Sequence, residues 1–134
     1  LLKAYGAHPV KRTSIDLKAY RWATDLLNQG NAIVIFPEGT RNPKSMNRPK
    51  KGAAKLALAT NAKIIPVGIT GTENLGTWLR VLNPTGKLTV NIGTAIDPNN
   101  YPELIANNDS EALLDIVMKE IAELVPCEYR GIYG

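Results

Sequence analysis

The chain has 134 residues, of which 44% are hydrophobic and 21% are charged, and its formal net charge at pH 7 is +4. This length and composition are ordinary for a single globular domain (residues 1–134) with a sizeable core. The one cysteine, Cys127, excludes an internal disulfide and argues against a cysteine metal site. The sequence shows no signal peptide and no apolar run of membrane-spanning length.

Charge is distributed unevenly along the chain. Residues 1–94 carry 14 Lys and Arg against 4 Asp and Glu, whereas residues 95–134 carry 2 against 8. The basic residues are densest from Arg41 to Lys55, and this stretch contains no acidic residue. The positive electrostatic potential of such a stretch favours binding of phosphate substrates, anionic lipid surfaces or nucleic acid. The alternative is a basic loop that is merely solvated.

The N-terminal part is predicted to hold an extended segment and a helix. Pro9 biases His8 away from the helical region, so Ala4–Arg12 is expected to be extended. A helix follows over Ser14–Gly30, because Ser14 suits the N-cap and Gly30 suits the position after the C-cap. Its core face is expected to comprise residues at helical spacing: Leu17, Tyr20, Ala23 and Leu27. Since neither methionine stands at the start, we expect the chain to be a portion of a longer product.

The most informative stretch is the apolar run Ile33–Phe36 with the turn that follows it. An uncharged β-branched run is typical of a strand that is buried on both faces. Pro37 cannot continue a central ladder and Gly39 permits a positive φ, so the strand should end in a tight turn. An acid, a hydroxyl and a guanidinium lie within Glu38–Arg41. The carboxyl ends of strands in open α/β sheets bind ligands, and a guanidinium fork suits a phosphate or carboxylate.

The next part alternates helix and strand signals. Residues 42–51 are rich in turn formers and predict a loop. An alanine-rich helix is expected from about Lys51 to Thr60, with its N-terminus at a basic segment, where an anion would be favoured. Ala62–Thr70 is predicted to be an inner strand, although Pro66 in its middle requires a bulge or a sheet edge.

The C-terminal part is predicted to contain one more strand and a final helix. Residues 71–86 are predicted to form a loop with a short helical turn at Leu75–Leu82, whose bulky side chains would line an apolar groove, touch lipid or close the core. Alternation over Lys87–Ile92 indicates a half-exposed strand. A polar connector over residues 97–108 precedes the last helix, residues 109–125, which is capped by Asp109 or Ser110. The order of elements predicts an α/β fold, with a mixed, largely parallel sheet flanked by helices.

The hexapeptide at the end of the first strand resembles a block of the glycerolipid acyltransferase family, whose best-known members are 1-acylglycerol-3-phosphate acyltransferases. The resemblance implies that these residues bind the acceptor, chiefly its phosphate and glycerol: Phe36, Pro37, Glu38, Gly39, Thr40 and Arg41. Arg41 would clamp the phosphate, and Glu38 and Thr40 would hydrogen-bond the glycerol. The alternative is an ordinary turn with a solvated arginine.

Further blocks of the family are matched in the same order, so the resemblance covers roughly Tyr5–Pro98. Gly6 and Arg12 are similar to a glycine–arginine pair that implies a second phosphate contact at Arg12, although a surface Lys-Arg pair is the alternative. Lys51 and Gly52 are similar to a lysine-glycine pair before an alanine-rich helix, and the resemblance implies that they also bind the acceptor. Ile65, Pro66 and Val67 resemble a proline-bearing block that the family associates with the side of the site that holds the acyl group or its carrier. The alternative is that these residues form a plain core strand.

The family's catalytic pair, His-x-x-x-x-Asp, is not matched in this chain. His8 is the only histidine, and the position that would hold the aspartate is Thr13. No catalytic residue is therefore assigned here. The family order places the pair upstream of Leu1, so the fold is expected to be N-terminally truncated and the chain to have little turnover alone.

The resemblance implies an acyltransferase of phospholipid biosynthesis that converts 1-acylglycerol-3-phosphate to phosphatidate. The acyl donor would be acyl-CoA or acyl carrier protein, with no metal or other cofactor, and the protein would work peripherally at the cytoplasmic, anionic face of a membrane. One alternative is an acyltransferase for glycerol-3-phosphate or another lysophospholipid. Another is a non-enzymatic anion-binding module. Nucleic acid is not an expected partner, because the few aromatics are not interleaved with the basic run.

Overall fold

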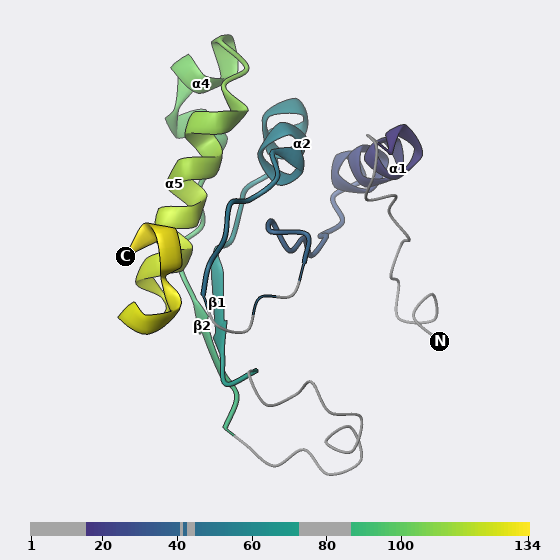
Figure 1. The fold of residues 1–134 in the computed structure, drawn as a ribbon. Coiled ribbons are helices and arrows are strands. Elements are labelled where there is room, and N and C mark those ends of the chain that lie inside the picture. Colours follow the sequence, from purple (N-terminus) through teal and green to yellow (C-terminus); the bar gives the residue numbers. More distant parts are fainter. Residues whose placement is uncertain (1–15, 41, 43–44, 73–86) are drawn as a thin grey trace, which may run out of the picture.

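The computed structural model describes residues 16–40, 42, 45–72 and 87–134 (Figure 1). Helices dominate this part of the chain. The α-helices are α1 (Leu17–Asn28), α2 (Gly52–Thr60), α4 (Pro102–Ala106) and α5 (Ser110–Glu123). Short 3₁₀ helices are η2 (Pro98–Asn100), η3 (Cys127–Tyr129) and η4 (Gly131–Tyr133). Two strands, β1 (Val67–Thr70) and β2 (Thr89–Ile92), pair antiparallel.

The hydrophobic core lies between α2 and α5, which pack against each other. Ala54 of α2 and Leu113 of α5 have no exposed surface, and Met118 of α5 is 1% exposed. The small side chains of α2 allow a close approach of the two helices. Met46, in the loop before α2, joins the same cluster and thereby fixes that loop to the core.

The predicted first helix is confirmed as α1. Its N-cap is Asp16, whose carboxylate accepts a hydrogen bond from the backbone N–H of Ala19 at 3.1 Å. The expected cap, Ser14, lies outside the described residues. Gly30 has a φ of +80°, which a glycine tolerates best, just beyond the helix end.

The predicted core face of α1 is only partly correct. The buried residues are Ala19 and Ala23, whereas Leu17 is 62% exposed. In the described part of the chain the main packing partner of α1 among the helices and strands is α2, and the buried strip of α1 is narrow. Periodicity identified the helix but could not tell how wide a strip its neighbour would cover.

The expected bulge beside Pro66 is present. Pro66 accepts a hydrogen bond from the N–H of Gly93 at 2.9 Å, and Ile64 and Ile96 exchange two bonds at 2.9 and 2.8 Å. Between the Ile64–Ile96 bridge and the Val67–Ile92 pair, one strand advances three residues and the other four. This extra residue is a β-bulge, which accommodates a proline that cannot donate to the ladder.

One face of the β1–β2 hairpin packs against the end of α5. A Cβ atom on Gly68 would lie 2.8 Å from Cβ of Leu124, and the side-chain amide of Asn91 donates to the Leu124 carbonyl at 2.7 Å. Side chains alternate across a strand, so the neighbouring residues point to the opposite face. That outer face consists of two directly opposed pairs, Val67 with Ile92 and Ile69 with Val90.

The prediction that Ala62–Thr70 is an inner strand is therefore wrong for the described structure. Val67 is 37% exposed and Ile69 is 42% exposed. The half-exposed strand predicted at Lys87–Ile92 forms β2, but its apolar residues face outward: Val90 is 50% exposed and Ile92 is 70% exposed. The small or polar residues Gly68 and Asn91 pack inward because they allow the backbone to approach α5 closely.

The predicted buried strand Ile33–Phe36 is also wrong for the described structure. These residues are in no strand, and Val34 is 87% exposed. An apolar β-branched run favours a strand, but a strand forms only where a neighbour pairs with its backbone, and no described segment does so. Within the described residues the only sheet is the antiparallel β1–β2 pair, and the largely parallel sheet stays a prediction.

The predicted final helix is confirmed as α5, with Asp109 at its N-cap. The Asp109 carboxylate accepts from the N–H groups of Glu111 at 3.2 Å and Ala112 at 3.0 Å. The predicted connector over residues 97–108 in fact contains η2 and α4, which are too short to produce a helical period in the sequence. In the part of the chain that the structure describes, no helix has both the length and the apolar character to cross a membrane.

Candidate functional site

The candidate site is built around the turn of the hexapeptide. The N–H of Gly39 donates to the Phe36 carbonyl at 3.0 Å, and Gly39 has a φ of +66°. The predicted tight turn with a glycine at positive φ is therefore confirmed. Phe36 is 70% exposed and Thr40 is exposed, so the turn presents both side chains outward.

The segment Met46–Lys50 holds the turn from the other side with two hydrogen bonds. The N–H of Lys50 donates to the Pro37 carbonyl at 2.8 Å, and the N–H of Asn47 donates to Oε2 of Glu38 at 3.0 Å. At the start of the segment, the N–H of Met46 donates to the Tyr129 carbonyl at 2.8 Å, and the Met46 side chain is buried. The turn is thus connected to the core through this segment.

Glu38 is engaged in this connection. Partial burial raises the pKa of the Glu38 carboxyl above its ordinary value, and the hydrogen bond from Asn47 opposes that rise. The hydrogen bond uses Oε2 and leaves the second carboxyl oxygen available for another donor. Glu38 can therefore hold the loop and at the same time accept from a ligand hydroxyl.

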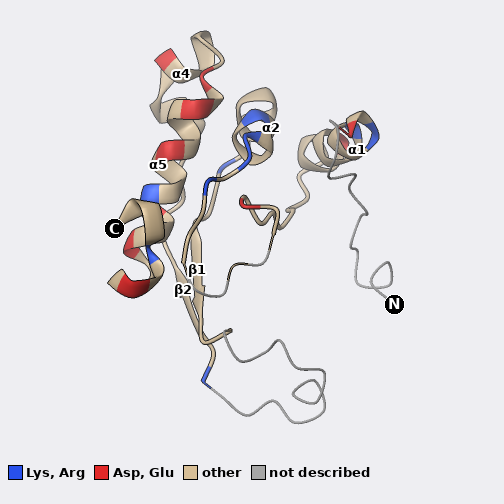
Figure 2. Cartoon of the chain, viewed as in Figure 1, with Lys and Arg blue, Asp and Glu red and all other residues tan. Residues whose placement is uncertain are grey.

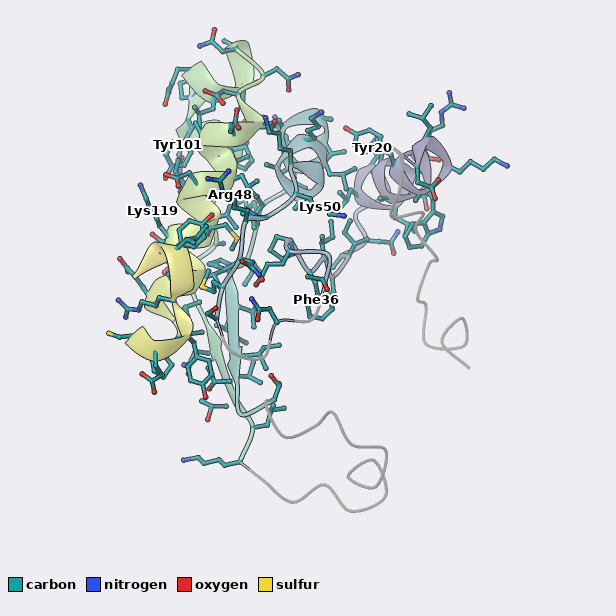
Figure 3. All side chains as sticks on the ribbon, in the orientation of Figure 1. Tyr20, Phe36, Arg48, Lys50, Tyr101 and Lys119 are labelled. Atoms are coloured by element: carbon teal, nitrogen blue, oxygen red, sulfur yellow. The ribbon has the colours of Figure 1, made fainter. Side chains whose placement is uncertain are left out.

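Lys50 lies directly over the turn. A Cβ atom placed on Gly39 would lie 3.3 Å from both Cδ and Cε of Lys50 and 3.5 Å from Nζ. Figure 3 labels Lys50 and Phe36 and shows both side chains beside the turn. Sequence reasoning placed Lys50 in the basic segment at the N-terminus of the second helix, where an anion is favoured, but it did not link Lys50 to the hexapeptide turn. Its contact with Gly39 depends on the return of the chain after the loop, which no local pattern reports.

Lys51 and Gly52 were predicted to bind the acceptor, and the structure places them at the start of α2. Lys51 is the N-cap residue, and its Nζ lies 3.0 Å from Oε2 of Glu111 on α5. It lines an open cavity of about 420 Å³ together with Lys55 and residues 107–111. The Lys51 ammonium thus points to α5, and Gly52 has open space where a Cβ would lie.

The residues predicted for the acyl or carrier side lie on the hairpin. Pro66 is fully buried against Gly93, whereas Ile65 is 59% exposed and Val67 contributes to the outer face. Their role in binding an acyl chain or carrier stays a prediction. Other predicted positions lie outside the described residues: Gly6, His8, Arg12, Thr13, Arg41 and the turn at 75–82.

Charge is segregated between two parts of the described structure. Figure 2 shows acidic residues on α4, α5 and the C-terminal turns, while the segment that leads into α2 is basic. Among the described residues, no group of three or more His, Cys, Asp or Glu side chains is placed to hold a metal ion. The chemistry that this arrangement offers is recognition of an anion at the basic turn.

Comparison with known proteins defines the family. The model of the Acyltransferase family matches residues 1–70, which include α1, the hexapeptide, α2 and β1. The chain therefore belongs to the Acyltransferase family. No solved structure matches it.

The more specific similarity is to one kind of enzyme within the family. The chain is 31% identical over 100 residues to a 1-acyl-sn-glycerol-3-phosphate acyltransferase of Borreliella burgdorferi, covering 74% of this chain and 40% of the relative. It is 30% identical over 119 residues to one of Chlamydomonas reinhardtii, covering 87% and 33%. It is 26% identical over 123 residues to one of Bacillus subtilis, covering 92% and 59%. The chain thus spans between a third and three-fifths of the length of these relatives.

Proposed function

We propose that this chain supplies the acceptor-binding part of an acyltransferase that converts 1-acylglycerol-3-phosphate to phosphatidate. Membership of the family and the activity for which its relatives are named support the reaction. The observation that carries the assignment of the site is the hexapeptide turn, held to the core by hydrogen bonds at Pro37 and Glu38. A preorganised turn of this kind can fix an acceptor in a reactive pose.

The reaction assigns two tasks to the protein. The acceptor hydroxyl oxygen forms an ester bond to the thioester carbonyl carbon, the carbon–sulfur bond breaks, and the hydroxyl proton is transferred to the departing thiolate. A hydroxyl is a weak nucleophile near neutral pH, so a base must take its proton during the attack. No residue of this chain is assigned that task. Binding of the acceptor phosphate is the task proposed for Arg41 and Arg12, with Glu38 and Thr40 at the glycerol hydroxyls.

The acyl donor in this proposal is acyl-CoA or acyl carrier protein, and Ile65–Val67 contribute to its side. The exposed aliphatic residues there are compatible with an apolar ligand. Glycerol-3-phosphate is the second candidate acceptor, because it shares the phosphate and glycerol that the turn would bind. The two acceptors differ in the acyl chain, so they are separate arms of the test.

The test is a thermal-shift titration of the chain with lysophosphatidate below its micelle range, glycerol-3-phosphate and inorganic phosphate. A ligand that binds only the folded form at 100 times its Kd adds about 2.7 kcal/mol to the free energy of unfolding. We expect shifts with the first two ligands that disappear in Arg41→Ala. The matched control is Arg21→Ala, which removes an equal charge from an exposed site on α1.

Two results would contradict the proposal. A cooperative transition with no response to any of the three ligands would remove the acceptor site. Affinity for arbitrary DNA with a steep salt dependence, and none for glycerol phosphate, would favour the non-enzymatic anion-binding module instead.

Peripheral association with the anionic, cytoplasmic face of a membrane is part of the same proposal. It is supported by the basic segment Arg41–Lys55 and by the amphiphilic character of the acceptor. The chain should sediment with vesicles that contain anionic lipid at low salt and should be released at high salt. Failure to sediment under low-salt conditions would contradict this part.

The largely parallel sheet also belongs to this proposal. Membership of the family supports it, although Ile33–Phe36 is in no strand of the described structure and β1 pairs antiparallel with β2 there. Amide hydrogen exchange tests it: pairing would protect the N–H groups of Ile33–Phe36 to the same degree as those of β1. Exchange at the rate of an open segment would rule the parallel strand out.

A further inference from the structure

We propose that Lys50, and not its neighbour Lys51, supplies the lysine cation that contacts the acceptor phosphate beside the hexapeptide turn. This inference rests on the proposed function and extends it to a residue that sequence comparison had not singled out. It assigns different tasks to two adjacent lysines. The assignment depends on where the structure directs each side chain.

The backbone of Lys50 is fixed on both sides. Its N–H donates to the Pro37 carbonyl at 2.8 Å, which ties it to the centre of the turn. The next residue, Lys51, is the N-cap of α2, and its carbonyl accepts the N–H of Lys55 at 3.0 Å. The Lys50 side chain therefore extends from a backbone position that is fixed between the turn and a packed helix.

The side chain of Lys50 then runs across Gly39. A Cβ at this position would lie 3.3 Å from Cδ and Cε, so the lysine stem would have to shift by a few tenths of an ångström to make room for it. Gly39 meets the requirement of the turn for a positive φ and leaves the lysine stem in direct contact with the backbone of the turn. The ammonium lies beside Gly39, the residue that precedes Thr40 and Arg41 in the sequence.

The two lysines differ in whether their ammonium group forms an ion pair. Lys51 forms an ion pair with Glu111, at 3.0 Å between Nζ and Oε2. Lys50 takes part in no ion pair within the described residues, where the remaining pairs are Lys63–Asp97 and Lys119–Asp115. The carboxylate of the turn itself, Glu38, accepts from the backbone of Asn47. The Lys50 ammonium is therefore the cation at the turn whose charge no described carboxylate neutralises.

A phosphate monoester is the ligand class that fits this arrangement. A lysine ammonium is a compact point charge with three donors, which complements the planar fork that an arginine offers to the same phosphate. Arg41 follows Thr40 in the sequence and lies outside the described residues. Lys50 would contact an oxygen of the phosphate.

The experiment compares Lys50→Ala with Lys51→Ala, which remove the same charge from adjacent positions. Calorimetric titration with glycerol-3-phosphate and with inorganic phosphate gives the Kd for each variant. Loss of a charge-assisted contact should weaken the affinity of Lys50→Ala about tenfold for both ligands. Lys51→Ala should change it by less than about twofold, and Lys50→Arg should retain most of it. Lysophosphatidate as a third ligand separates the contribution of the lipid chain from that of the phosphate.

A second measurement avoids variants altogether. Limited acetylation of the unmodified chain, read by mass spectrometry, reports the reactivity of each lysine. Phosphate should protect Lys50 selectively and leave Lys51 at its unliganded reactivity. Because the Lys50 hydrogen bond to Pro37 uses the backbone, Lys50→Ala should unfold at the same temperature as the original chain.

The outcomes separate this inference from the proposed function. If the original chain binds glycerol-3-phosphate and Arg41→Ala does not, but Lys50→Ala binds as well as the original, the role of Lys50 is overturned and the acceptor site stands. Equal losses in Lys50→Ala and Lys51→Ala would also overturn it, since a general charge effect would explain both. If the original chain binds none of the ligands, the proposed function and the role of Lys50 are both overturned.

Discussion

The α2–α5 core and the outer face of the β1–β2 hairpin are equally apolar in sequence but very different in environment. Leu113 of α5 is 0% exposed, whereas Ile92 of β2 is 70% exposed. The helices bury their apolar residues against each other, while the hairpin uses Gly68 and Asn91 to contact α5 and directs its β-branched residues away. Apolar character therefore predicts which residues favour burial, and the element packed beside them decides which are buried.

The largest expected effect contrasts the two regions directly. Leu113→Ala should lower the free energy of unfolding by about 2–5 kcal/mol, because it leaves a cavity in a close-packed core. Ile92→Ala should change it by less than about 0.5 kcal/mol, since most of that side chain is already in water. Urea unfolding of both variants measures the difference. Equal losses would mean that the outer face of the hairpin is covered in solution.

The next effect concerns the inner face of the hairpin. Gly68→Ala should destabilise the protein by about 1–3 kcal/mol, because the new Cβ would lie 2.8 Å from Cβ of Leu124 and 2.9 Å from Cγ1 of Val125. Gly52→Ala is the control, because nothing lies within 4 Å of its Cβ position. Thermal unfolding distinguishes the two. A neutral Gly68→Ala would show that the hairpin does not pack on the end of α5.

A smaller effect is expected at the start of α5. Asp109→Ala should cost about 1 kcal/mol, because the N–H groups of Glu111 and Ala112 would lose their acceptor. Asp115→Ala removes the same side chain in the middle of the helix, where it pairs with Lys119 at the surface. That control should cost about 0.2–0.5 kcal/mol. If chemical denaturation gave the same value for both variants, the cap would have no special role.

The smallest effect concerns pH and lies at the junction between the two regions. The hydrogen bond from Asn99, with Lys63 nearby, holds the pKa of the Asp97 carboxyl below its ordinary value of 3.8. An acid with a lowered pKa in the folded state stabilises the protein above its unfolded pKa, and this contribution is lost as pH falls through the folded pKa. Asp97→Asn should therefore show a slightly shallower loss of stability below about pH 4. Identical acid unfolding curves would contradict this account.

Local signals in the sequence predicted the helices well. Asp109 caps the last helix and Gly30 follows the first helix, as predicted, and an alanine-rich run became α2. The first helix is capped by Asp16, where Ser14 was expected. Each of these features acts through residues within one turn of the helix, so the information needed to predict it is local. The tight turn at Gly39 was predictable for the same reason.

Predictions about strands and side-chain contacts were less successful. Ile33–Phe36 has strand composition but no partner in the described structure, and β1 is exposed on the face expected to be buried. The hexapeptide was found from its residues, yet its link to Lys50 was not. Both failures concern contacts between segments that are distant in the chain, and no local pattern encodes them.

The sequence by itself determined the family, the position of the hexapeptide turn and the helices that flank it, because motif residues and caps act over a few neighbouring positions. Only the tertiary structure decided that Met46–Lys50 returns to hold this turn, that Lys50 covers Gly39 and that Lys51 pairs with Glu111. Adjacent lysines have the same chemistry and the same local sequence. What separates them is the direction in which the folded backbone points each side chain.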